Sequence, residues 1–251
     1  MKRKVLSSLF PLVFWLFLWE AAARLVWHTA ELGGELLLPS PGQVLAALWE
    51  LCRAPLFWQT ALLSLGRILL GVLLGSLAGT LLAWLTAFHP RWRTLLSPLI
   101  KTVRAAPVAS FILLLLLWVQ RDAVPTVIAA LMVLPVVWSG VEQGIAGADP
   151  QLLELARCYR FSRGKTLLLC RLPALLPPFS SSLATALGLA WKAGVAAEVL
   201  CQPKFAIGTQ IYRTKTLFST PQLFAWTLVV ILLSLLMERG MGRLLKGRWK
   251  G

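Results

Sequence analysis

Long apolar runs separated by short polar clusters dominate the 251-residue chain. A helix needs about 20 mostly apolar residues to cross the ~30 Å hydrocarbon core of a bilayer. Six runs, bounded by charged residues or Pro/Gly clusters, approach or exceed that length: Val5 to Trp27, Thr60 to Phe88, Val103 to Val119, Ala123 to Val141, Phe179 to Leu200 and Leu217 to Met237. The pattern predicts an all-α polytopic membrane protein with six transmembrane helices, the third and fourth joined in a tight hairpin.

Composition agrees with a bilayer as the solvent. Hydrophobic residues make up 58% of the chain and charged residues only 14%, against about 25% charged in soluble domains. The net charge of +15 does not indicate nucleic-acid binding, because the basic residues lie between apolar runs instead of on one water-facing surface. The four cysteines have neither CxxC nor His-flanked spacing, so no metal site is predicted.

Lys and Arg residues predict the orientation, since cytoplasmic loops hold an excess of them. With six helices, 17 of the 25 fall on one side. They are Lys2, Arg3, Lys4, Arg91, Arg93, Lys101, Arg104, Arg157, Arg160, Arg163, Lys165, Arg171, Arg239, Arg243, Lys246, Arg248 and Lys250. Both termini are therefore predicted to be cytoplasmic, with the Glu31 to Gln59 and Cys201 to Thr216 loops outside. Within the first outer loop, Leu38 to Gly42 predicts a rigid turn followed by a helix from about Gln43.

Small residues recur every four positions along the second apolar run. Gly71, Gly75, Gly79, Ala83 and Ala87 would share one helix face, where another backbone can approach closely. The spacing predicts tight helix packing. It leaves open whether the neighbouring helix belongs to this chain or to a second subunit.

Ionisable residues inside apolar runs are costly and need an explanation. Glu20 and Arg24 are four residues apart and can pair with each other. Arg67, near the outer end of its helix, can extend its charge to the interface or face a translocation pathway. Lys192 and Glu198 lie about 120° apart around a helix. We expect Lys192 to face the pathway or a partner carboxylate and Glu198 to lie near the outer mouth, with purely structural pairing as the alternative.

The segment from Glu142 to Pro178 is too long and too patterned for a passive connector. Asp149 offers an N-cap with Pro150 at the first helical position, and Gln151 to Tyr159 continue a helix. Its apolar residues are Leu152, Leu155, Ala156 and Tyr159; opposite them lie Glu154, Arg157 and Arg160. An amphipathic helix that docks a partner is predicted.

The same loop resembles the EAA signature of permease subunits of ABC importers, in which Glu-Ala-Ala, Gly, Ile and Leu-Pro recur at fixed intervals. Here the intervals hold Glu154-Leu155-Ala156, Arg160, Cys170 and Leu172-Pro173. Arg160 stands where the signature has glycine, so the arginine must either adopt the bend after the helix, at a cost, or shift it. Further segments look like the nitrate, sulfonate and taurine group, among them Leu38-Pro39-Ser40-Pro41 and Arg104-Ala105-Ala106-Pro107.

The resemblance implies a single permease domain over residues 1–251, with a core of about 60–240 and a type I importer fold, in the bacterial inner membrane. It implies a homodimer, two cytoplasmic ATP-binding subunits and an extracytoplasmic binding protein that delivers a small solute such as a sulfonate, nitrate or taurine. Asp149 to Ser162 would be the coupling helix that contacts the ATPase. The expected interface residues are Asp149, Leu152, Leu153, Glu154, Ala156, Arg157, Tyr159, Arg160 and Phe161.

The sequence gives little support to other functions. Gly164-Lys165-Thr166 looks like the end of a P-loop, but the first glycine of that motif is absent and no strand precedes it. ATP and Mg²⁺ are therefore expected on the partner ATPase, and no cofactor on this chain. His28 and His89 are isolated, which argues against a membrane enzyme. An ion-coupled secondary transporter stays the main alternative.

Overall fold

The computed structural model describes residues 2–29 and 34–247, and these residues form helices and no strand. The helices are α1 (Lys2–Thr29), α2 (Gly34–Leu37), α3 (Pro41–Arg53), α4 (Pro55–Phe88), α5 (Pro90–Ala105), α6 (Val108–Leu115), α7 (Val124–Ala146), α8 (Pro150–Cys158), α9 (Arg163–Thr166), the π-helix η1 (Leu167–Arg171), α10 (Leu172–Cys201), α11 (Ile207–Thr216) and α12 (Thr220–Gly247). The all-α prediction is confirmed. The predicted start of the outer loop at Glu31, and two of the basic tail residues, Arg248 and Lys250, lie outside the described residues.

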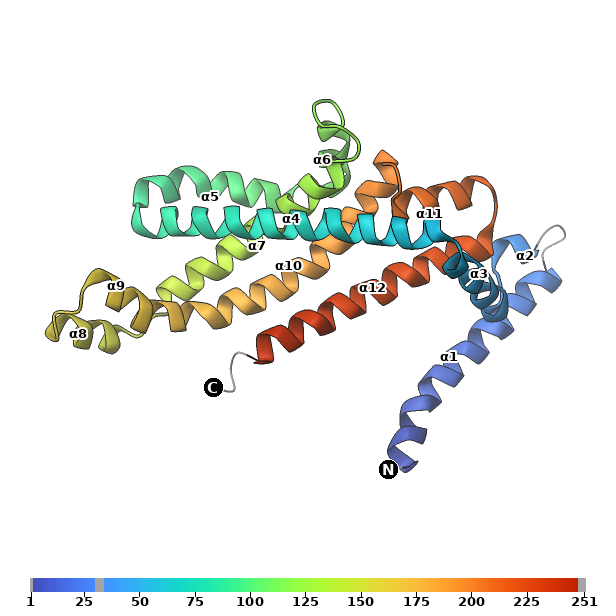
Figure 1. The fold of residues 1–251 in the computed structure, drawn as a ribbon, viewed down its shortest axis with the longest axis horizontal. Helices are drawn as coiled ribbons and strands as arrows, with labels where there is room; N and C mark the ends of the chain where they lie inside the picture. Colours follow the sequence, from blue (N-terminus) through green and yellow to red (C-terminus); the bar gives the residue numbers. More distant parts are fainter. Residues whose placement is uncertain (1, 30–33, 248–251) are drawn as a thin grey trace.

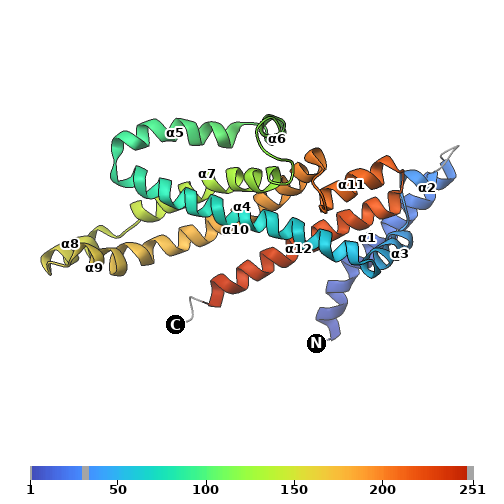
Figure 2. The same ribbon diagram turned by 45° about the horizontal axis from the view of Figure 1, so that its top comes forward.

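Four long helices, α4, α7, α10 and α12, run along the long axis of the molecule, and α5 folds back beside α4 (Figures 1 and 2). Helix α7 packs extensively on both α4 and α10 and so forms the centre of the bundle. One end carries α8, α9 and the α4–α5 turn, and we call it the α8 end. The opposite end carries α3 and α11, and we call it the α11 end (Figure 1).

Within the described residues, four segments are long and apolar enough to cross a membrane: Pro55–Phe88, Val124–Ala146, Gly164–Cys201 and Thr220–Arg243. The bent pair formed by α5 and α6 adds a fifth if it counts as one span. Helix α1 has 28 residues but is not among these segments. A multi-pass membrane protein is therefore supported, while the six-span count and the cytoplasmic termini stay predictions.

The predicted third span, a single helix from Val103 to Val119, is wrong. Helix α5 ends at Ala105, Ala106 is extended with φ −74° and ψ 144°, and α6 starts at Val108. The two helices meet at 101°. Pro107 explains the break, because a proline disfavours helical geometry at the residue before it. Consequently Lys101 and Arg104, expected in a cytoplasmic loop, lie exposed along α5.

The polar turn before α3 follows the sequence prediction closely. Ser40 caps α3: its hydroxyl accepts from Gln43 N at 3.3 Å, and the Gln43 side chain accepts from Ser40 N at 2.9 Å. This reciprocal capping box satisfies two backbone donors at the helix start. The helix begins at Pro41, two residues before the predicted start, because proline is well suited to the first turn.

Helix α1 is held to the rest of the chain near its C-terminal end. The indole of Trp19 donates to Pro39 O at 3.1 Å, and that of Trp27 donates to Leu38 O at 2.9 Å. Glu20 and Arg24 pair at 2.8 Å, as predicted from their spacing. Farther toward the N-terminus, Phe10 and Phe17 are exposed. This apolar half of α1 therefore needs lipid or another chain to cover it.

Candidate functional site

Helix α8 is locally well defined and anchored at the α8 end. The Asp149 side chain accepts from Gln151 N at 2.9 Å, which confirms the predicted N-cap. Ala156 is buried and Leu153 half-buried, so these two residues face the rest of the protein. The Cys170 thiol contacts Leu152 O at 3.9 Å and links α8 to η1. The predicted loop is thus mostly helical and shorter than expected, because α7 continues to Ala146 and α10 begins at Leu172.

Three large apolar side chains, two on α8 and one at its C-cap, point away from the bundle. Leu152, Leu155 and Tyr159 are 47%, 54% and 70% exposed, respectively. Their spacing of three and four residues aligns them on one side of the helix, and we call them the α8 ridge. An exposed apolar ridge of this kind is typical of an interaction surface.

The bend after α8 is a Schellman motif centred on Arg160. Phe161 N donates to Ala156 O at 2.8 Å, and Arg160 N donates to Arg157 O at 2.9 Å. Arg160 has φ 50°, in the left-handed region. The prediction that an arginine adopts a bend suited to glycine is confirmed, at a cost of roughly 1–2 kcal/mol for a residue with a Cβ.

A polar cluster that the sequence analysis missed joins three helices near the α8 end. Thr86 of α4 donates to Glu142 Oε1 at 2.8 Å and accepts from Trp138 Nε1 at 3.0 Å. Arg93 of α5 approaches the same carboxylate at 3.8 Å. Glu142 follows directly on an apolar run, and a carboxylate at such a position was the sequence signal that could have predicted this cluster.

The glycine stripe of α4 packs against α7 of the same chain. A Cβ on Gly75 would lie 2.5 Å from Ala130 O, and one on Gly79 would lie 2.7 Å from Leu134 O. Gly71 faces the backbone oxygen of Thr126 in α7, one turn before Ala130. All three glycines are buried. The helices approach so closely that no side chain fits between them. The structure thus identifies α7 of the same chain as the neighbouring helix, which the sequence left open.

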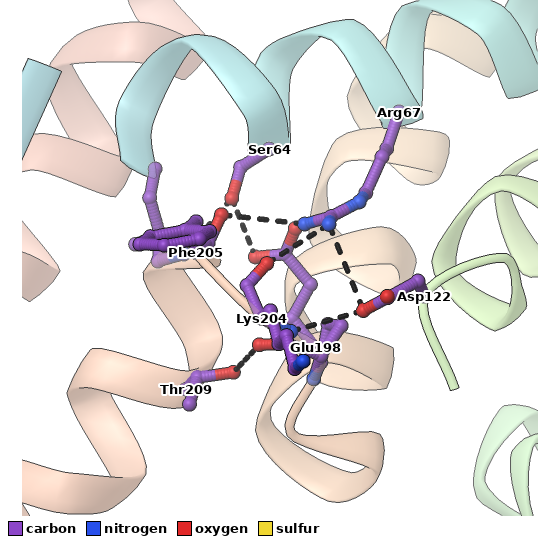
Figure 3. A network of polar contacts seen from close by, with 9 residues as sticks. Ser64, Arg67, Asp122, Glu198, Lys204, Phe205 and Thr209 are labelled. Carbon is purple, nitrogen blue, oxygen red and sulfur yellow. Dashed lines mark hydrogen bonds and ion pairs between the residues drawn. The ribbon is translucent and has the colours of Figure 1, made fainter. Parts of the chain in front are cut away.

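Figure 3 shows a second polar network, at the α11 end, built around Glu198. Its side chain is 0% exposed, and Oε2 accepts from Ser64 Oγ at 2.9 Å and from Gly208 N at 3.1 Å. Ser64 Oγ in turn accepts from Ile207 N at 2.9 Å. Glu198 therefore fastens the start of α11 to α4 and α10.

Arg67 belongs to the same network (Figure 3). Its guanidinium donates to Lys204 O at 2.9 Å and to Phe205 O at 3.3 Å, and lies 3.7 Å from Asp122 Oδ1. The Asp122 carboxylate also accepts from Lys204 N at 2.9 Å. Arg67 and Asp122 thus hold the turn between α10 and α11 against α4 and the segment before α7. These contacts give Arg67 and Glu198 a structural role, and the pathway role expected for them stays a prediction.

Lys192 lies apart from both networks. It is exposed on α10, whereas its neighbours Trp191 and Ala193 are buried. Within the described residues it forms no ion pair with Glu198 or with any other carboxylate. Ser181, Thr185 and Ala196 are exposed on the same side of α10. Leu189 is also exposed on this side, which therefore mixes small and polar residues with one leucine, whereas the surface of α4 is rich in leucine.

Comparison with known proteins supports this architecture. Residues 71–250 match the family described as binding-protein-dependent transport system inner membrane component. A probable ABC transporter permease protein of Haemophilus influenzae is 28% identical over 237 residues, which cover 94% of this chain and 93% of the relative. The taurine transport system permease protein TauC of Escherichia coli is 26% identical over 248 residues, which cover 96% and 88%.

The fold also matches a solved structure. The crystal structure of an amino acid ABC transporter with histidines aligns with a TM-score of 0.62 and 18% identity, over 76% of this chain and 92% of that chain. The similarity shows a shared fold. With a family match over most of the chain, the protein belongs to the binding-protein-dependent transport system inner membrane components, as an ABC importer permease of the group that includes the taurine permease.

Proposed function

We propose that the chain is the transmembrane subunit of an ATP-driven importer for a small organic anion. Two copies would form the pathway, two cytoplasmic ATPase subunits would supply energy, and an extracytoplasmic protein would deliver the solute. Family membership supports this assembly, and the taurine permease among the relatives supports a sulfonate or a similar anion. ATP hydrolysis would occur on the partner, since Gly164-Lys165-Thr166 lies within the short helix α9 and follows no strand in the described chain.

The α8 ridge is the observation that carries the proposal. Its three apolar side chains are exposed at the end of the molecule where basic residues predict cytoplasm. Helix α8 is capped at both ends and connects α7 to the segment that begins α10. A short helix held in this way can transmit movement of a bound ATPase to the membrane helices as a rigid body.

We predict that Leu155→Asp weakens ATPase binding about tenfold or more, because burying a new carboxylate in an apolar groove is costly. Leu155→Met keeps an apolar side chain of similar volume and serves as the matched control. Co-purification of the co-expressed ATPase and solute-stimulated ATP hydrolysis measure the effect. Equal ATPase recovery with both variants would contradict a docking role for the ridge.

The energy source can be tested separately. Uptake of radiolabelled taurine or another sulfonate is measured in cells that express the permease with and without the ATPase. An ABC importer loses uptake when the ATPase is deleted. Uptake that persists and depends on an ion gradient would instead support an ion-coupled secondary transporter.

Lys192 is our candidate for the translocation pathway. It is an exposed cation with no carboxylate partner among the described residues, and Ser181 and Thr185 are exposed on the same side of α10. An unpaired charge within an apolar helix favours a site that reaches water or an anion over one that faces lipid. We propose no pathway role for Arg67 and Glu198, because the Arg67 guanidinium and Glu198 Oε2 bind backbone and side-chain groups of this chain.

We predict that Lys192→Met lowers anion uptake about tenfold, the effect of losing one favourable charge contact of ~1.4 kcal/mol. Lys192→Arg keeps the charge and is expected to retain most uptake. Proteoliposome uptake and basal ATP hydrolysis are measured for both variants. Full uptake by Lys192→Met, with the complex intact, would remove Lys192 from the pathway.

A further inference from the structure

A basic pocket at the α8 end is not used by the proposed docking or transport. Its volume is about 520 Å³. It is lined by Phe88, Arg157, Phe161, Thr166, Leu167 and Arg171. These residues come from the end of α4, from α8 and the bend after it, and from α9 and η1. Two regions distant in sequence, the end of α4 and the segment from α8 to η1, therefore converge on one hollow.

Two guanidinium groups without a carboxylate partner face this pocket. No acidic side chain lines it. Within the described residues, neither Arg157 nor Arg171 forms an ion pair. The guanidinium carbon of Arg171 lies 5.1 Å from the centre of the Phe88 ring, a cation–π contact that holds the cation at the apolar wall. Such a pair of arginines is suited to an anion with several oxygens, such as a phosphate.

The surroundings place the pocket at the edge of the membrane. Leu168 and Leu169 of η1 are 63% and 56% exposed next to the lining residue Leu167. A neighbouring hollow shares Phe88 and adds Arg91 and Trp92. Exposed leucines beside tryptophan and arginine mark the level where acyl chains give way to headgroups.

Arg157 points to the side of α8 away from the ridge. Residues two positions apart lie about 200° apart around a helix, so Arg157 is roughly opposite Leu155 and Tyr159. A partner that covers the ridge therefore leaves Arg157 free for the membrane side. This changes the expectation that Arg157 contacts the ATPase.

We propose that Arg157 and Arg171 bind the phosphate of an anionic phospholipid from the leaflet at the α8 end, with Phe88 and Leu167 against its apolar part. Basic pockets between membrane helices on the cytoplasmic side recognise such headgroups by charge and hydrogen bonding. The proposal requires α4 and α10 to span the bilayer. It does not depend on the ATPase, because the pocket is formed within one chain.

The test is native mass spectrometry of the full-length protein with added phosphatidylglycerol or phosphatidylcholine. The wild type is expected to retain phosphatidylglycerol preferentially. The double variant Arg157→Gln/Arg171→Gln should retain it roughly thirtyfold less, since each of the two basic residues near an anionic surface contributes about 1 kcal/mol. Arg121→Gln/Arg213→Gln removes two exposed arginines elsewhere and is the matched control, with retention unchanged.

Several outcomes would overturn the proposal. A wild type that does not distinguish the two lipids would do so without any variant, so a folding defect in the double variant cannot hide the answer. Equal loss in the control would show a general charge effect. Competition by millimolar inorganic phosphate would assign the pocket to free anions. Unchanged lipid retention with loss of the ATPase would assign the arginines to protein contact.

Discussion

Gly75→Leu is expected to leave little correctly folded protein. A Cβ at this position would lie 2.5 Å from Ala130 O and 2.8 Å from the Val133 Cβ, and the larger part of a leucine has no space. The obstacle is the backbone of α7, which cannot turn aside as a side chain can. We expect a loss of about 3 kcal/mol or more in stability, at or above the upper end for overpacked cores.

Gly66→Leu is the matched control for this variant, because a Cβ on Gly66 has nothing within 4 Å. Both substitutions add the same side chain and the same helix propensity to α4. Monodisperse yield in detergent and thermal unfolding measure the difference. Similar unfolding temperatures for the two variants would show that α4 and α7 do not pack as described.

Glu198→Leu is the second substitution with a large expected effect. Leucine cannot accept hydrogen bonds from Ser64 and Gly208, so two donors lose their partner in a buried site. Each unsatisfied buried group costs about 1–3 kcal/mol, which gives a loss of roughly 3 kcal/mol when partial relaxation is allowed. Glu198→Gln keeps a carbonyl acceptor and should lose less.

Glu238→Leu is a suitable control, since Glu238 is an exposed glutamate on α12. Thermal unfolding and hydrogen exchange at Ile207 and Gly208 are the measurements. Faster exchange at these two amides in Glu198→Leu alone would confirm that the carboxylate holds α11. An unchanged exchange rate would mean that the network contributes little to the position of α11.

The features that follow from neighbouring residues were predictable. Asp149 and Pro150 start α8 through a cap and a fixed φ, and Arg160 occupies the bend where the motif has glycine. The local signal for the bend between α5 and α6 was also present in Ala106-Pro107. The apolar run from Val103 to Val119 is long enough for one span, but Pro107 within it breaks the helix.

The candidate site was predictable only in part. The apolar spacing of Leu152, Leu155 and Tyr159 indicated an amphipathic helix, but not which part of it would be covered. Ala156 is buried and the three larger residues are exposed because α8 packs through its smallest side chain. Arg157 lines the same pocket as Phe88, 69 positions earlier, and no local pattern connects the two.

By itself, the sequence determined that the protein is built for a membrane, that its fold is all-α, and where local helix caps lie. Hydropathy, helical period and capping all depend on residues only a few positions apart. Only the tertiary structure decided which helix covers Gly75, which donors reach Glu198 and where Arg157 points. Ser64 lies 134 residues from Glu198, and their contact exists only after α4 and α10 have packed. The sequence predicted helix α8. Which of its apolar side chains are exposed as the α8 ridge depends on the side of α8 that packs against the rest of the protein.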